Sequence, residues 1–124
     1  YQCQLLVSTS LFWHLRVVVD IEALPVALKT HLPLLLELLG ECDLQDPVTR
    51  KVTPYTDVAQ ALDRETVSWA ASVGAGGSTF GPSHLSHVFS LYFCVEQSLS
   101  PNLVKWGAVL LQQTRFTMER VTAK

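Results

Sequence analysis

The stretch Leu24–Gly40 is the most apolar run of the sequence and constrains the fold more than any other segment. Its leucines recur at the spacing of a helix and form one broad apolar stripe, made by Leu24, Leu28, Leu32, Leu35, Leu36 and Leu39. Pro25 suits a first helical turn and Gly40 suits a helix end. Pro33 lies inside the pattern and predicts either a kink or a helix that begins near residues 30–33. We therefore expect a helix that packs into a core.

The overall composition favours one small domain, residues 1–124, with a core of its own. The chain has 48% hydrophobic and 16% charged residues, which argues against disorder. Its net charge of −2 gives no electrostatic reason to expect nucleic acid or an anionic membrane as a partner. The apolar run at 32–39 is interrupted by Glu37 and is shorter than the roughly 20 residues that span a bilayer. We expect neither nucleic acid nor a membrane among the partners.

The three cysteines, Cys3, Cys42 and Cys94, are odd in number and lack paired spacing. This pattern argues against a disulfide scaffold and against a structural zinc site. We expect buried free thiols in a reducing compartment. An intracellular location, the cytoplasm or the mitochondrion, is favoured, but the sequence does not identify the compartment. The low charge and the positive mean hydropathy also favour a chain with apolar surface meant for a neighbour in a larger assembly.

Three stretches have the composition and alternation of strands. Residues 11–21 are rich in β-branched and aromatic side chains, and residues 67–73 alternate with a period of two. Residues 84–96 are apolar on both faces, as in a strand that is covered on both sides or meets a partner. The Gly-rich loop 74–82 would join the last two strands as an antiparallel hairpin.

Further helices are predicted on either side of this hairpin, and residues 41–53 are read as a polar connection. The first has Thr53 as its cap and Pro54 in its first turn. Its expected apolar face is Tyr55, Val58, Ala59 and Leu62, and its expected solvated face is Asp57, Asp63, Arg64 and Glu65. The next begins at Ser100-Pro101, with a core side made by Leu103, Trp106, Val109, Leu110 and Gln113. Thr117 is expected to cap a last helix.

The predicted order is therefore strand, helix, helix, strand, strand, helix and a final short helix. Strands joined by a tight Gly-rich loop pair antiparallel, and the helices are grouped apart from them. This order predicts the α+β class, with an antiparallel sheet and helices packed on one face.

The histidines do not suggest a metal site. His84 and His87 stand three residues apart, which would place them on one face of a helix but on opposite faces of the strand expected here. His14 is alone in a strand and is expected to be a half-buried histidine with a hydrogen-bond partner. No metal-ligating residue is predicted.

The sequence also lacks a recognisable catalytic motif. None of the serines considered lies in a Gly-x-Ser-x-Gly turn; these are Ser68, Ser72, Ser78, Ser83 and Ser86. The loop 74–81 lacks the Gly-Lys-Ser/Thr ending of a phosphate-binding loop and leads into a strand. The carboxylates Asp57, Asp63 and Glu65 belong to an expected solvated helix face. We predict no catalytic and no cofactor-binding residue.

An ordered series of motifs gives a resemblance to a known family. The series is Arg16-Val17-Val18-Val19-Asp20; Leu24-Pro25-x-x-Leu28-x-x-His31-Leu32-Pro33-Leu34-Leu35-x-x-Leu38-Leu39; Tyr55-x-x-Val58-x-x-x-Leu62-x-x-x-Thr66-Val67-Ser68; a Gly-rich turn and a strand; and Arg115-Phe116-Thr117-x-Glu119-Arg120-Val121. It resembles the insulinase/pitrilysin family of zinc metallopeptidases, and most of all the branch of the presequence proteases and their cytosolic-type relatives. The resemblance covers residues 16–124, whereas residues 1–12 are poorly assigned.

The resemblance implies a domain from a clamshell of two or four α/β units that enclose a peptide-binding chamber. The family's catalytic domain carries His-x-x-Glu-His on a helix, which gives two zinc ligands and a general base. The matching helix here has His31, but Leu34 and Leu35 occupy the positions of the glutamate and the second histidine. Glu37 is six residues from His31, the wrong spacing for a shared face. No zinc ligand is therefore carried over, and the family's third ligand would lie past residue 124.

The resemblance thus predicts an incomplete pitrilysin-type domain, a non-catalytic and chamber-forming segment of an insulinase-type zinc metalloendopeptidase. Zinc is expected in the catalytic domain of the parent, and the chain alone is expected to be inactive. The implied partners are the remaining domains of the parent and its peptide substrate. Two alternatives stay open: a purely structural family member, like the core subunits of respiratory complexes, and an unrelated α+β interaction module.

Overall fold

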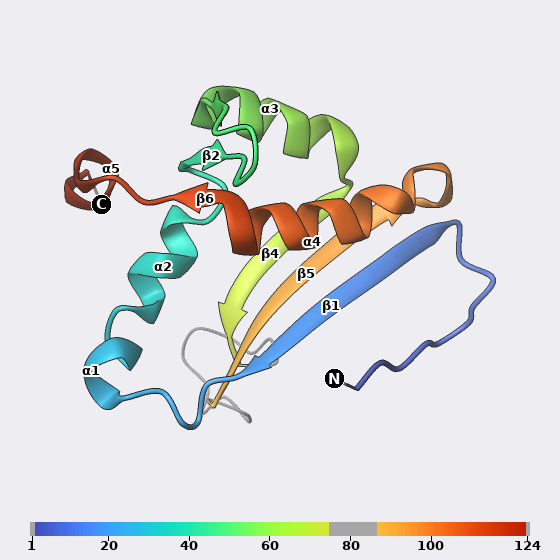
Figure 1. Ribbon diagram of the computed structural model, residues 1–124. Coiled ribbons are helices and arrows are strands. Elements are labelled where there is room, and N and C mark those ends of the chain that lie inside the picture. Colours follow the sequence, from blue (N-terminus) through green and yellow to red (C-terminus); the bar gives the residue numbers. More distant parts are fainter. Residues whose placement is uncertain (1, 75–86, 124) are drawn as a thin grey trace.

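The computed structural model describes residues 2–74 and 87–123 (Figure 1). Its elements are β1 (Phe12–Asp20), α1 (Val26–Lys29), α2 (Leu32–Leu38), β2 (Asp43–Gln45), β3 (Val52–Thr53), α3 (Tyr55–Glu65), β4 (Ser68–Val73), β5 (Val88–Glu96), the 3-10 helix η1 (Gln97–Leu99), α4 (Pro101–Gln113), β6 (Thr114–Arg115) and α5 (Met118–Thr122). Helices and antiparallel strands are segregated, so the predicted α+β class is confirmed.

The main sheet has the order β1-β5-β4, and both pairs are antiparallel. Leu91 in the central strand lies opposite Val17 of β1 and Ala71 of β4. The predicted hairpin of β4 and β5 is thus confirmed, although most of its loop, residues 75–82, and His84 lie outside the described residues. The central position of β5 explains why nearly all of its residues are buried on both faces.

The core lies between the main sheet and the helices. In Figure 1, α4 runs across one face of the sheet, with α3 and α2 on that same side. Alternate residues of the strands point into this layer, among them Leu15, Val17, Leu91 and Phe93, and the helices supply Val58, Leu62, Leu103, Trp106 and Leu110. These helical residues stand three, four or seven positions apart, so the predicted core sides of α3 and α4 are largely confirmed.

The single helix expected over residues 24–40 is two short helices instead. The chain breaks between α1 and α2, and Pro33 takes a position in the first turn of α2, where its missing N–H costs no hydrogen bond. Of the two alternatives that Pro33 raised, the later helix start is the one observed. The predicted stripe is also interrupted, because Leu28 on α1 is 53% exposed while Leu32 and Leu38 on α2 are buried.

The polar connection expected over residues 41–53 contains structure that the sequence reading missed. Strands β2 and β3 form a small antiparallel hairpin, and β6 pairs with the other edge of β2. The Asp46 carboxylate accepts hydrogen bonds from the backbone N–H groups of Val48 and Thr49, at 2.7 and 2.9 Å. The bonds from Thr49 and Val48 hold the pKa of Asp46 below its ordinary value. Local turn chemistry therefore organises a segment that has no apolar periodicity.

The predicted cap of α3 is wrong, because Thr53 makes no capping bond and Pro54 precedes the helix. Asp43 on β2 supplies the acceptor, and its Oδ1 lies 2.9 Å from the N–H of Tyr55. Tyr55 and Ala59, both expected on the apolar face, are exposed, and Ala61 packs against the core instead. The cap predicted for the last helix is confirmed, because the Thr117 hydroxyl accepts from the N–H of Arg120.

Within residues 2–74 and 87–123, none of the helices has the length and apolarity that crossing a membrane requires.

Candidate functional site

The helix α2 occupies the place that the family resemblance assigns to a zinc helix. His31 immediately precedes α2, and its carbonyl accepts a 3.0 Å hydrogen bond from the N–H of Leu35. The two residues therefore stand one helical turn apart, the spacing of a paired ligand site. The imidazole of His31 is exposed, whereas Leu34 and Leu35 are half-buried. Leu35 packs against the core, and Glu37 is exposed.

Other residues considered as metal ligands are dispersed through the described part of the chain. No three histidine, cysteine, aspartate or glutamate side chains of residues 2–74 and 87–123 come together as a metal-binding group. His87 is exposed in the turn just before β5, and not within the strand as expected. Cys3 is an exposed free thiol. Cys42 and Cys94 are buried free thiols as expected, whereas the expected burial is wrong for Cys3.

Of the serines considered as nucleophiles, Ser68 and Ser72 lie in the described part of the chain. Ser68 is exposed, and Ser72 is half-buried beside Ser90, with 2.9 Å between their hydroxyl oxygens. The Ser90 hydroxyl also donates to the carbonyl of Gly74 at 2.9 Å. Both hydroxyls are therefore held by each other and by the backbone, an arrangement that supplies no base to activate either one. Ser78, Ser83 and Ser86 lie outside the described residues.

A polar cluster that the sequence reading did not find lies on the face of the main sheet turned away from α4. His14 on β1 and Tyr92 on β5 form its centre, with 2.7 Å between Nδ1 and the phenolic oxygen. The guanidinium carbon of Arg16 stands 5.6 Å from the centre of the Tyr92 ring. The pairing register brings these residues together, because His14 lies opposite Cys94 and Arg16 lies opposite Tyr92. Only the strand register, not the sequence alone, could have revealed this cluster.

The electrostatics of this cluster favour a neutral phenol. Burial raises the pKa of Tyr92, and neighbouring Cys94 adds to the rise more than Arg16 offsets. Tyr92 thus keeps its proton at neutral pH and exchanges a hydrogen bond with His14. His14 is exposed rather than half-buried as expected, although its predicted hydrogen-bond partner is present. The cluster offers hydrogen bonds and a cationic side chain, without an activated nucleophile.

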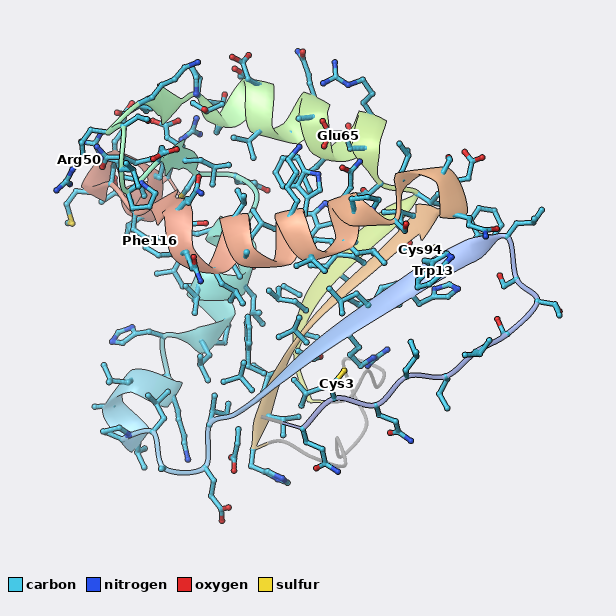
Figure 2. All side chains as sticks on the ribbon, turned by 45° about the vertical axis from the view of Figure 1, so that its right-hand side comes forward. Cys3, Trp13, Arg50, Glu65, Cys94 and Phe116 are labelled. Atoms are coloured by element: carbon cyan, nitrogen blue, oxygen red, sulfur yellow. The ribbon has the colours of Figure 1, made fainter. Side chains whose placement is uncertain are left out.

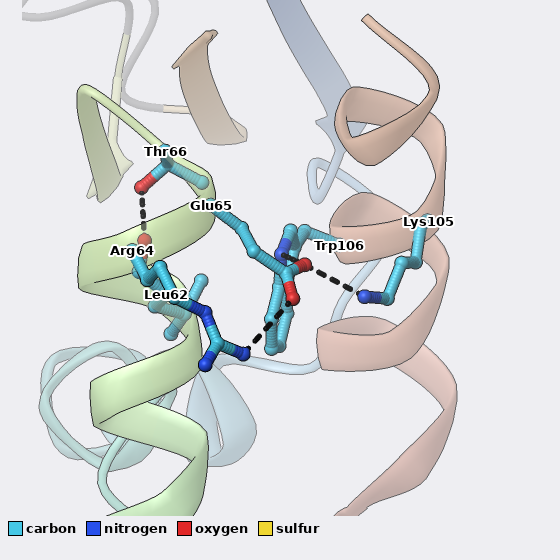
Figure 3. A network of polar contacts seen from close by, with 6 residues as sticks. All are labelled: Leu62, Arg64, Glu65, Thr66, Lys105 and Trp106. Carbon is cyan, nitrogen blue, oxygen red and sulfur yellow. Dashed lines mark hydrogen bonds and ion pairs between the residues drawn. The ribbon is translucent and has the colours of Figure 1, made fainter. Parts of the chain in front are cut away.

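A second polar network joins the helices α3 and α4, and Figure 3 shows it from close by. Glu65 Oε2 accepts hydrogen bonds from Lys105 Nζ at 2.7 Å and from Trp106 Nε1 at 3.0 Å. Arg64 lies 3.6 Å from Oε1 of the same carboxylate. The prediction that Glu65 belongs to a solvated face is therefore wrong, because its side chain is only 21% exposed and reaches the neighbouring helix.

The hydrogen bond from Lys105 holds the pKa of Glu65 below its ordinary value, and the bond from Trp106 adds to this shift. The carboxylate is therefore ionised and fully engaged with its neighbours at neutral pH. We assign it a structural role in holding α3 against α4, not a role as a general acid or base.

A third contact group connects α5 to the first turn of α3. The guanidinium carbon of Arg120 lies 3.4 Å from the ring centre of Tyr55. Burial raises the pKa of the Cys42 thiol, while the positive charge of Arg120 acts in the opposite direction. Cys42 is therefore a protonated, fully buried thiol, which is an inert group rather than a nucleophile.

Comparisons of this chain with protein-family models, with curated proteins and with solved structures found no match.

Proposed function

We propose that this chain is a non-catalytic, chamber-forming segment of an insulinase-type zinc metallopeptidase. One observation carries the proposal: in the strand–helix order that resembles this family, the half-buried Leu34 and Leu35 occupy the positions of the catalytic glutamate and the second histidine. His31 keeps the position of the first histidine. The other domains of the parent would supply the zinc, the general base and the hydrolysis of the peptide.

The packing of α2 supports a core role for this helix. Leu35 and its neighbour Leu36 contact the hydrophobic core, and Leu32 and Leu38 are buried. A carboxylate or an imidazole at residues 34 and 35 would lose contact with water, and no bound metal would compensate for this loss. For a charged group the desolvation costs several kcal/mol. The helix is therefore built for burial of apolar surface.

The surface of the chain supports a place inside a larger assembly. Large apolar side chains are exposed at the start of β1 and in the segment before it, including Leu6, Leu11, Phe12 and Trp13. A surface of this composition is typical of a face that another protein segment covers. A chamber-forming domain would present such a surface to the remaining domains of its parent.

The first test is zinc content and peptidase activity of the purified 124-residue chain. We expect far less than one zinc per chain by elemental analysis and no cleavage of internally quenched peptides. The His31→Ala variant is the control, and it should give the same values as the unchanged chain. Stoichiometric zinc that is lost in the His31→Ala variant would overturn the proposal.

The second test separates the proposal from its alternatives. The reading frame that encodes this chain should also encode a His-x-x-Glu-His helix in another domain. A complete frame without that motif favours the purely structural family member instead. An experimental structure of the full-length parent gives the strand order of the sheet. A strand order unlike that of the peptidase domains favours an unrelated interaction module.

A further inference from the structure

The strand β1 is an edge of the main sheet, and its outward backbone groups can be identified from its pairing with β5. The N–H of Ile21 bonds the carbonyl of His87 at 2.7 Å, and the N–H of Gln97 bonds the carbonyl of Leu11 at 3.0 Å. Odd-numbered residues of β1 therefore bond to β5. The even-numbered residues, from Phe12 to Asp20, direct their N–H and C=O groups away from the sheet.

The strand β1 itself lacks the features that usually protect an edge against pairing with another strand. Natural edge strands are often short, or carry a proline, a lysine or a bulge. β1 is nine residues long, pairs with β5 without a bulge, and contains neither proline nor lysine. Val18 and Val19 are 55% and 41% exposed at its C-terminal half. The edge is therefore a template for one more antiparallel strand.

We propose that β1 pairs antiparallel with β1 of a second copy of this chain, about a two-fold axis at Val18. In this register Val18 lies opposite its own counterpart, with both N–H and C=O groups directed outward as a hydrogen-bonded pair requires. Arg16 of each copy lies opposite Asp20 of the other. The sequence is thus self-complementary in charge about this one residue.

The apolar face agrees with the same register. Val17 lies opposite Val19 of the other copy, and Leu15 lies opposite Ile21, on the side of the sheet that faces the helices. The exposed Val19 side chain is then covered by an aliphatic partner. A shift that centres the axis on Arg16 would instead place two guanidinium groups opposite each other, which disfavours that register.

The segment that precedes β1 lies beside it and would move aside for this pairing. Residues 2–10 run beside β1 in both Figure 1 and Figure 2, and their side chains are exposed. No backbone group of residues 2–10 bonds to the backbone of β1, although the Ser10 hydroxyl accepts a hydrogen bond from the N–H of Phe12 at 3.1 Å. The segment is therefore free to swing aside without breaking a strand ladder.

Thiol crosslinking tests the position of the axis. In a Cys3→Ser background, which removes the exposed native thiol, Val18→Cys should form a disulfide-linked dimer under mild oxidation. Directly opposite residues of a hydrogen-bonded pair lie about 5.5 Å apart at Cα, within the range of a disulfide. Val48→Cys is the matched control, because Val48 is 88% exposed and is more accessible to random collision. Equal or faster crosslinking of the Val48→Cys variant would overturn the proposal.

Charge exchange tests the register by a route that needs no added thiol. Asp20→Lys should raise the dimer dissociation constant, measured by sedimentation, about tenfold, because two like-charged pairs replace two opposite pairs. The double variant Arg16→Asp/Asp20→Lys should restore the dissociation constant to within about threefold of that of the unchanged chain. Circular dichroism confirms that each variant folds. The proposal is contradicted if the unchanged chain stays monomeric at its highest soluble concentration. It is also contradicted if the double variant dimerises more weakly than Asp20→Lys.

Discussion

The carboxylate of Glu65 and the indole of Trp106 connect α3 to α4 through a hydrogen bond of 3.0 Å, although 41 positions separate them in the sequence. Trp106 is 4% exposed, so its N–H has little access to water if Glu65 is removed. A partly buried donor without an acceptor costs about 1–3 kcal/mol. The contact is therefore expected to hold the two helices in place over the sheet.

Removal of this carboxylate gives the first prediction. We expect Glu65→Ala to lower the free energy of unfolding by about 1–3 kcal/mol, measured by urea denaturation. Asp63→Ala is the control, because Asp63 is an exposed carboxylate on the same helix and should change stability by less than about 0.5 kcal/mol. Equal effects of the two substitutions would show that the Trp106 contact contributes nothing.

The pH dependence of stability gives the second prediction. The folded-state pKa of Glu65 is lowered, chiefly by the hydrogen bond from Lys105, so its contribution is present above its unfolded pKa of about 4.3. It is lost as the pH falls through the lower, folded pKa. The difference in unfolding free energy between the unchanged chain and Glu65→Gln should therefore shrink as the solution is acidified below about pH 4. A difference that stays constant into acid would contradict this assignment.

The main sheet was predictable from sequence because its signals are local and regular. The alternation along β4 and β5 and the Gly-rich loop between them indicate an antiparallel hairpin, and the apolar positions of α4 recur at helical spacing. The strands β2, β3 and β6 were missed because each has only two or three residues, too few to show a period. β2 pairs with β3 in a local hairpin and with β6 across a long sequence separation, where Asp43 lies opposite Arg115.

The polar contacts were less predictable than the core. Glu65 stands on the expected wet face of α3, and nothing in the helix pattern indicates that Trp106 will offer it an N–H. The pair of His14 and Tyr92 likewise depends on the β1–β5 register, which a single sequence does not give. The absence of a glutamate and a histidine from residues 34 and 35, in contrast, is readable directly from the sequence.

The cap of α3 gives a prediction that separates the sequence reading from the structure. Asp43→Ala removes the acceptor that lies 2.9 Å from the N–H of Tyr55 and should cost about 1 kcal/mol in the free energy of unfolding. Asp43→Asn keeps a capping oxygen and should recover most of that loss. Thr53→Ala, which alters the residue predicted as the cap, should have the smaller effect. A larger loss in Thr53→Ala than in Asp43→Ala would restore the sequence-based assignment.

Thiol accessibility gives the fourth prediction. Cys3 is exposed, whereas Cys42 and Cys94 are buried, and burial raises the pKa of Cys42. A short treatment with iodoacetamide at neutral pH should therefore alkylate Cys3 and leave the other two thiols unmodified. Mass spectrometry of peptides checks the sites, and treatment in denaturant should modify all three. Alkylation of Cys42 in the folded chain at the rate of Cys3 would contradict the packing around the small sheet.

Two glycines should respond in opposite directions to the same substitution. Gly40 ends the α2 segment with φ +82°, and an added Cβ there would lie 2.5 Å from Cζ2 of Trp69. Gly40→Ala should therefore lower the free energy of unfolding by about 2 kcal/mol or more, because both the backbone conformation and the indole oppose it.

Gly107 lies within α4, where an added Cβ would meet Cδ2 of Leu15 at 3.7 Å, an ordinary van der Waals contact. Gly107→Ala should raise the free energy of unfolding by up to about 1 kcal/mol, since alanine favours a helix interior more than glycine does. Thermal and urea denaturation of both variants measure these opposite changes in the free energy of unfolding. A stabilised Gly40→Ala variant would show that Trp69 does not pack against the end of α2. A strongly destabilised Gly107→Ala variant would show that α4 lies closer to β1 than the contact with Leu15 indicates.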